Sequence, residues 1–335
     1  MDTNPASPSS HTPNGEPQGL EPAVNDDTYF FDDGDCVFVV EGYFFKVHKV
    51  ILSRDPESMF RIMFTLPQGS APHGKELDPI VLSGDSADEF RSLCWALYAL
   101  PTEIQAQNHH EADIERLVVV AKMAHKYSLS SFETWALSMI RIHSQSERDY
   151  LDHCPQNLLD GVYEAAAAGG CQDLCELVEE KWLARLKHRE LHLRHALDFG
   201  ETHDMRPFLV SAYYQQAQDM QSFAPRLSTG SEITDFSCLN LTHSQLHRLL
   251  SGYCSLSLFW ETCIGTSFQT CASNNNRYHK STMHDILIRD PKNPLDILGG
   301  LKNARQKAEG DFNCSCRKAY IDKLISGFSI SNHFR

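Results

Sequence analysis

A predicted β-hairpin near residue 40 is the feature that most constrains how this chain can fold. The run Val37-Phe38-Val39-Val40 has the β-branched and aromatic residues that favour a strand, and Tyr43-Phe44-Phe45 is a second run of that kind. Only Glu41-Gly42 separates the runs, which favours a tight turn in which Gly42 takes a positive φ angle. Ile80-Val81-Leu82 is short and apolar enough to be a third strand, so we expect a small sheet.

Apolar residues at helical spacing surround these strands. Ser86 and Glu89 have the spacing of a capping box, which predicts a helix that begins there and is stopped by Pro101. Another helix is expected soon after Pro56, because proline suits a helix start. The fold class predicted for this region is α+β, with helices over residues 47–51, 59–64, 86–98, 114–126 and 130–142.

The order of these elements, together with particular residues, resembles the BTB/POZ family and its fungal (basidiomycete-like) branch. The resemblance covers about a third of the chain, and the segments that carry it are residues 35–40, 45–52, 60–64, 78–82, 89–90, 97–98 and 124–127. The resemblance implies a small sheet flanked by a cluster of helices, a protein-binding role and no catalysis. The positions that carry this fold signature are Asp35, His48, Leu52, Phe60, Phe90, Tyr98, His125 and Tyr127.

The same resemblance bears on the partners. Members of the family bind themselves, cullin scaffolds of ubiquitin ligases, or transcriptional partners. Cullin-binding members tend to carry an apolar residue, any residue and then Glu after the second helix, whereas this chain has Leu66-Pro67-Gln68. The swapped dimer of the family uses an N-terminal helix and strand, for which residues 1–28 offer no candidate. Other proteins are therefore the expected partners, with a homo-oligomer and a cullin both left open.

Asp35 and His48 are polar residues embedded in apolar sequence. They could form an acid/base pair, but we favour a structural role in which both are buried and bind the backbone. That role would lock the hairpin to the first helix, since an unsatisfied buried polar group costs ~1–3 kcal/mol. The sequence also contains no Gly-x-Ser-x-Gly elbow, phosphate loop or zinc-protease helix motif, so an enzyme is not expected.

Composition sets the class of protein. Residues 1–28 hold five prolines among small polar residues and are expected to form a disordered tail with no secretory signal. No run approaches the ~18 apolar residues of a membrane span. The net charge of −14, without a Lys/Arg cluster, argues against nucleic acid and anionic lipid as partners. We expect a soluble protein in the cytoplasm or nucleus, where its 11 cysteines are free thiols.

The rest of the chain is predicted to be an α-helical module. A faint repeat supports helix pairs, because Leu129, Cys171 and Met205 each follow a turn and open a second helix. The predicted organisation is a tail at 1–28, a BTB/POZ-like domain at 29–145, a helical extension of helix pairs at 150–225 and a mainly helical region at 236–335. Helices of the module are expected at residues 158–168, 171–186, 191–199, 206–218, 242–256, 295–301 and 320–328.

The last hundred residues contain side chains of the types that bind zinc. The candidate ligands are Cys263, Cys271, His279 and His284, with Cys314 and Cys316 nearby. Zinc modules usually present two ligands as Cys-x-x-Cys, and no such pair occurs here. We therefore expect free cysteines, no metal and no cofactor.

The sequence thus predicts an intracellular protein–protein interaction scaffold or adaptor, and no enzyme. Two alternatives stay open: a substrate adaptor of a cullin ubiquitin ligase, and a zinc-dependent transcriptional regulator. The acidic charge and the missing finger spacing favour the transcriptional regulator least.

Overall fold

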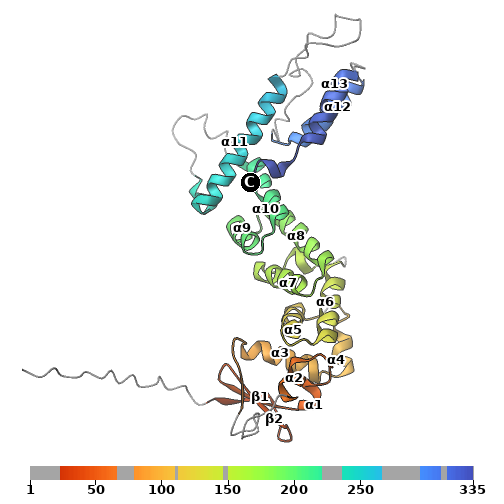
Figure 1. Cartoon of the computed structure of the whole chain (residues 1–335), viewed down its shortest axis with the longest axis vertical. Helices are drawn as coiled ribbons and strands as arrows, with labels where there is room; N and C mark the ends of the chain where they lie inside the picture. The colour runs from red at the N-terminus through yellow and green to blue at the C-terminus, as the bar shows by residue number, and fades with distance from the viewer. Residues whose placement is uncertain are drawn as a thin grey trace, which may run out of the picture. The chain divides into compact units, whose positions relative to one another are not determined.

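The computed structural model describes residues 23–65, 79–109, 112–145, 150–220, 236–265, 295–310 and 315–334 (Figure 1). These residues form an α+β protein that is mostly helical and has one small mixed sheet in its N-terminal part. The chain divides into two compact units. The first unit comprises residues 1–150 with 161–174, and the second comprises residues 151–160 with 175–335.

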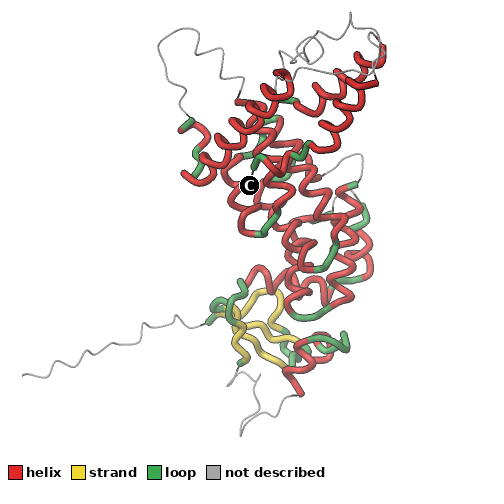
Figure 2. The backbone as a smooth tube through the Cα atoms, turned by 45° about the horizontal axis from the view of Figure 1, so that its top comes forward, coloured by secondary structure: helices red, strands yellow, loops and turns green. Residues whose placement is uncertain are grey.

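The sheet belongs to the first unit and is drawn in yellow in Figure 2. Its strands are β1 (Val24–Phe30), β2 (Cys36–Val40), β3 (Tyr43–Val47) and β4 (Ile80–Leu82). The strand order is β1-β3-β2-β4, in which β2 and β3 are antiparallel while β1 and β4 run parallel to their neighbours. The predicted hairpin and third strand are confirmed, and Glu41 and Gly42 have φ angles of 45° and 79°, as a type I′ turn requires.

Strand β1 corrects the expected boundary of the tail. We expected residues 1–28 to be disordered, but the strand begins at Val24 and pairs with β3 from Tyr43 onward. The sequence of β1, VNDDTYF, has two aspartates, which are rare in strands, so local preference points away from a strand. The structure thus supplies an N-terminal strand where we expected none, while residues 1–22 lie outside the described part of the chain.

Six helices accompany the sheet in the described residues up to 145. The capping box at the start of α3 is confirmed, because the Glu89 N–H donates to Ser86 Oγ over 3.2 Å and the Glu89 carboxylate accepts the Ser86 N–H over 2.8 Å. Pro101 does more than follow α3: it opens α4, a helix that we did not expect. The bounds are α1 (Lys49–Leu52), α2 (Met59–Thr65), α3 (Ala87–Tyr98), α4 (Pro101–Ala106), α5 (Ile114–Lys126) and α6 (Ser130–Ser144).

Seven helices occupy the rest of the described chain, and each overlaps a predicted helix. Their bounds are α7 (Gln156–Ala168), α8 (Gln172–Lys187), α9 (Leu193–Thr202), α10 (Arg206–Asp219), α11 (His243–Gly265), α12 (Ile297–Gly310) and α13 (Ser315–Gly327). Among the described residues, no helix has both the length and the apolar character needed to cross a membrane.

The faint sequence repeat corresponds to one backbone turn used three times. Ser128, Gly170 and Asp204 take positive φ angles of 55°, 66° and 51° just after α5, α7 and α9. The next residue in each case donates its N–H to a carbonyl five residues earlier, the long bond of a Schellman motif, and then a second helix begins. These bonds are Leu129 to Ala124 (2.8 Å), Cys171 to Ala166 (2.8 Å) and Met205 to Gly200 (2.9 Å).

The second unit has its own apolar core. Tyr213, Trp260 and Phe334 are almost completely buried in it, together with leucines and isoleucines of α11, α12 and α13. The packing is close at Gly252, where a Cβ atom would lie 2.0 Å from the Phe334 ring. The end of the described chain is therefore held against α11, because only glycine leaves room for that ring.

Candidate functional site

The apolar positions of the fold signature meet in the core of the first unit. Leu52, Phe60 and Phe90 are fully buried, and Tyr127 is 6% exposed. The Phe60 and Tyr127 rings stack with centroids 4.5 Å apart, while the Phe38 ring of β2 contacts both Phe60 (5.7 Å between centroids) and Phe90 (5.6 Å). These contacts join the sheet to α2, α3 and the end of α5, which fixes the surfaces of those helices in place.

His48 and Tyr98, two polar signature residues, bind each other. The Tyr98 hydroxyl accepts the backbone N–H of His48 over 2.9 Å and lies 3.0 Å from His48 Nδ1. The other ring nitrogen of His48 is 3.3 Å from the carboxylate of exposed Asp33. Burial of the phenol is the main reason that the pKa of Tyr98 rises to about 12, while the bond from His48 acts in the opposite direction. One hydroxyl thus joins the end of α3 to the start of α1.

Asp35 lies at the surface, whereas we expected it to be buried. Its side chain is exposed, not buried, and Oδ1 accepts the N–H of Lys49, the first residue of α1, over 2.7 Å. The expected backbone contact between hairpin and helix is present, but it forms at the surface, where water solvates the rest of the carboxylate. His48 is also only partly buried, with 26% of its side chain exposed. The expectation that both residues are buried is wrong.

The signature residue His125 lies at the end of α5. Its Nδ1 is 2.8 Å from a carboxylate oxygen of Glu133 on α6. That pair faces the turn after α7, since a Cβ atom at Gly169 would lie 2.9 Å from the same oxygen. Glycine at this turn lets the two helix pairs approach each other closely.

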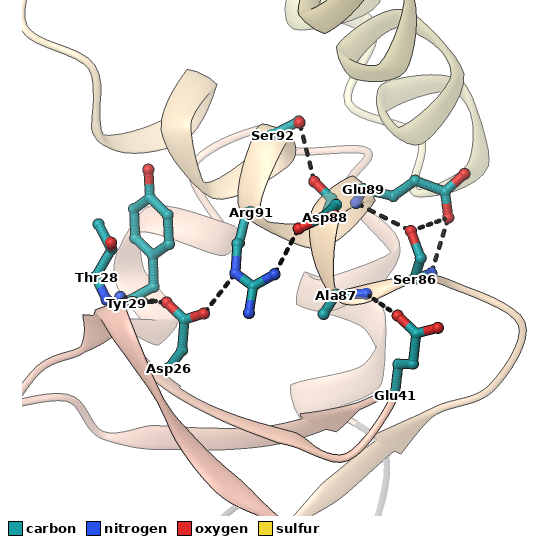
Figure 3. A network of polar contacts seen from close by, with 10 residues as sticks. All are labelled: Asp26, Thr28, Tyr29, Glu41, Ser86, Ala87, Asp88, Glu89, Arg91 and Ser92. Atoms are coloured by element: carbon teal, nitrogen blue, oxygen red, sulfur yellow. Dashed lines mark hydrogen bonds and ion pairs between the residues drawn. The ribbon is translucent and has the colours of Figure 1, made fainter.

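Sequence reasoning missed the buried ion pair of Asp26 and Arg91, which attaches β1 to α3 (Figure 3). The Asp26 side chain, only 2% exposed, accepts Arg91 Nε over 2.7 Å and the N–H groups of Thr28 (3.1 Å) and Tyr29 (2.8 Å). The guanidinium also lies 4.6 Å from the Tyr43 ring centroid. Burial favours the neutral guanidine, but the bonds to Asp26 and Asp88 outweigh it and raise the pKa of Arg91.

Asp85, also missed, is the second buried carboxylate. It accepts the hydroxyl of Tyr127 and the ammonium of Lys126, both at the end of α5. Burial, together with the Asp85 carboxylate, raises the pKa of the Tyr127 phenol. Since Asp85 directly precedes the capping residue Ser86, its contacts fix the start of α3. Its only signal in the sequence was its place in a polar turn, Gly84-Asp85-Ser86.

The two cysteine thiols in the core around the sheet are poorly suited to chemistry. Cys36 and Cys94 are fully buried, and burial raises the pKa of Cys36 to about 12 and that of Cys94 further. A thiolate, the form that attacks substrates or binds metal, is therefore disfavoured at neutral pH. The contacts of Asp26 with Arg91, of His48 with Tyr98, and of Asp85 with Tyr127 each join one part of the unit to another.

Only one of the four zinc candidates lies in the described chain. Cys263 is 2% exposed on α11, and burial raises the pKa of its thiol to about 11. Cys271, His279 and His284 lie outside the described residues. Within residues that the structure does describe, no three His, Cys, Asp or Glu side chains form a group able to hold a metal ion.

The surface feature that suits protein binding is the apolar face of α1 and α2. Val50, Met59 and Ile62 are exposed by 74%, 47% and 56%, although the two helices contact each other and are anchored in the core through Leu52 and Phe60. Large apolar side chains gain most from leaving water, so such residues on a rigid support are typical of interfaces. We call Val50, Met59 and Ile62 the α1–α2 surface.

Comparisons with models of protein families, with curated proteins and with solved structures found no match.

Proposed function

We propose that this chain is a non-catalytic scaffold or adaptor that binds other proteins through a BTB/POZ-like domain at residues 24–145. The α1–α2 surface carries the proposal. Its three apolar side chains are exposed, while the polar groups described above hold strands and helices of the same unit together. An exposed apolar surface on a rigid support suits a partner protein better than it suits a small substrate.

Further support comes from the aromatic contacts of the signature residues. Phe60 and Phe90 both contact Phe38, and Tyr98 binds His48, so residues distant in sequence pack together. This arrangement agrees with a small sheet flanked by helices. The acidic charge of −14 favours protein partners over nucleic acid, since it repels phosphate.

The alternative adaptor function, recruitment of a cullin, makes a narrower claim. The triplet Leu66-Pro67-Gln68, where cullin-binding members have Glu, lies outside the described residues. The zinc-dependent regulator remains the third candidate. A cullin that co-purifies with the chain would indicate the cullin adaptor, and zinc that co-purifies with it would indicate the zinc-dependent regulator.

The test is affinity purification of the tagged full chain from its own cells, with mass spectrometry of the proteins retained. Replacing Val50 and Ile62 together by serine removes two exposed apolar side chains, so folding should be unaffected. We expect the doubly substituted chain to retain at least tenfold less of each main partner than the unchanged chain does. The matched control is Leu100→Ser, which changes a side chain that is equally exposed (63%) but lies at the start of α4.

An equal loss of partners from Leu100→Ser, or no loss from the double substitution, would contradict the assignment of the α1–α2 surface. Circular dichroism of each variant establishes that the chains compared are folded.

A further inference from the structure

A cavity of about 510 Å³ in the second unit is suited to a ligand. It lies between the end of α8, α9, α10 and the residues just before α11, and those of its lining residues that the structure describes fall between positions 186 and 240. Its apolar lining is formed by Leu186, Leu191, Leu193, Ala212 and Leu239. This volume is within the range of ~300–1,000 Å³ that small ligands and short peptide segments occupy.

Arg189 lies at the rim of the cavity, and its guanidinium has hydrogen-bond donors that the described chain does not use. Its side chain is 68% exposed, and its described partner, Asp219, lies 3.8 Å away, which is too far for a hydrogen bond. The guanidinium can donate five hydrogen bonds in a planar fork that matches a carboxylate. An incoming carboxylate would therefore find donors that the protein itself does not use.

The backbone at Arg189 is also unusual. Its φ angle is 59°, in the left-handed region that favours glycine. The residue ends α8 in a Schellman motif, in which the Glu190 N–H donates to the Arg185 carbonyl over 3.0 Å. Glycine would satisfy this backbone better, so the backbone itself gives no reason for arginine at this position. The Arg189 side chain faces the Asp219 carboxylate, and both residues line the cavity.

Gln215 provides a second unused donor in the lining. Its Nε2 atom is buried, and no acceptor in the described chain binds it. A buried amide donor without a partner costs ~1–3 kcal/mol. Because water does not reach this atom, a ligand carbonyl accepts its hydrogen bond only after the Gln215 side chain has turned towards the cavity. The donor is on α10, which also supplies Ala212 to the apolar lining.

The rim itself is held in shape by a second arginine. Arg194 Nε pairs with Asp198 at 2.6 Å, and its Nη1 donates to the carbonyl of Asn240 over 3.0 Å. These bonds attach residues 238–240 to α9, which keeps Leu239 in the lining. Arg194 is thus a fixed part of the cavity wall, and Arg189 is the cation that remains available.

We propose that this cavity binds a short segment of a partner protein in which an acidic residue lies beside an apolar one. The carboxylate pairs with Arg189, a peptide carbonyl accepts the Gln215 amide, and the apolar side chain lies on the leucines of the lining. The site goes beyond the proposed function, since no residue of 24–145 contributes to it. It gives an adaptor its second binding surface.

The test uses the purified full chain, immobilised, and a soluble library of acetylated and amidated hexapeptides. One central position is fixed as Glu and the others are random, and a matched library has Gln at the fixed position. We expect the Glu library to be retained at least tenfold more than the Gln library. Equal retention of the two libraries would overturn the proposal. Displacement of the Glu library by an equal concentration of N-acetylglutamate would also overturn it, because the ligand would then be a small carboxylate.

Three variants assign the binding to the cavity. Arg189→Gly removes the guanidinium and suits the backbone, so it should abolish the preference for Glu without lowering the melting temperature. Gln215→Leu should reduce retention at least threefold and leave the melting temperature unchanged or higher. Arg206→Ala is the control, since Arg206 is also exposed but lies outside the cavity lining. A Glu preference that survives Arg189→Gly, or that is lost equally in Arg206→Ala, would refute the site.

Discussion

The contact between β1 and α3 gives the sharpest test of how the first unit is held together. Arg91→Met keeps an apolar stem but leaves the Asp26 carboxylate, only 2% exposed, without its cation. Breaking a fully buried ion pair costs ~3–5 kcal/mol. Arg91 is 33% exposed, so water can replace part of the contact, and we expect the loss of the ion pair to cost about 2–3 kcal/mol. The lost contact with the Tyr43 ring adds about 0.5–1 kcal/mol. We expect a total destabilisation of about 3 kcal/mol.

The Asp26→Asn change separates charge from shape. It should partly rescue Arg91→Met, because the buried charge that was left unpaired is then gone. We expect a coupling of at least about 1 kcal/mol between the two changes in a double-mutant cycle. Arg116→Met is the matched control: this arginine also lies over a ring, that of Trp95, but pairs with the 43% exposed Asp113, and its loss should cost under ~1 kcal/mol.

Hydrogen exchange with mass spectrometry, on peptides that cover β1, is the suitable assay. Thr28 and Tyr29 donate their N–H groups to Asp26, so their protection reports the contact directly. It also separates the first unit from the second, which a global melting curve does not. The reasoning fails if Arg91→Met changes the protection of β1 no more than Arg116→Met, or if the double variant is additive.

Three further predictions concern other parts of the chain. Burial raises the pKa of Tyr98 to about 12 from an ordinary value near 10. The contribution of the protonated Tyr98 hydroxyl to stability is therefore constant below about pH 10 and is lost as pH rises towards 12. Tyr98→Phe should flatten this part of an alkaline unfolding curve. Gly252→Ala should destabilise the second unit by about 1–3 kcal/mol, because the new Cβ would lie 2.0 Å from the Phe334 ring. Gly327→Ala is the control and should cause no such loss, because Gly327 has open space around it. Thermal unfolding compares the two variants. We also expect less than one zinc per chain by elemental analysis and unchanged circular dichroism in excess chelator, since Cys263 lies in an apolar core; one zinc per chain with helicity lost on chelation would contradict this.

The elements that the sequence predicted well are those whose signals are local. The turn at Glu41-Gly42 and the capping box of Ser86 and Glu89 depend on residues within a few positions of one another, and both have the expected geometry. The repeat of Leu129, Cys171 and Met205 was faint as sequence because only one backbone conformation is shared. In each of these cases the information needed lies in a short window.

The elements that were missed depend on distant partners. Strand β1 is stabilised by Arg91, which is 65 residues from Asp26, so no window around the strand contains the reason for it. The same is true of Asp85, whose partners begin 41 residues later. Asp35 and His48 were recognised as important, but their exposure depends on which surfaces the helices cover. Arg189 was not noticed, because nothing in the sequence around it indicates a left-handed backbone conformation.

The parallel position of β1 also sets an order of assembly. The β2–β3 hairpin can form as soon as residue 47 is available, whereas the Asp26 side chain of β1 obtains its cation only when Arg91 has been made. At synthesis rates of ~5–20 residues per second, the 65 residues that separate Asp26 from Arg91 correspond to a delay of about 3–13 s. During that interval β1 can pair with β3 but lacks the ion pair that attaches it to α3. The distance along the chain between Asp26 and Arg91 therefore sets how long the Asp26 carboxylate waits for its cation.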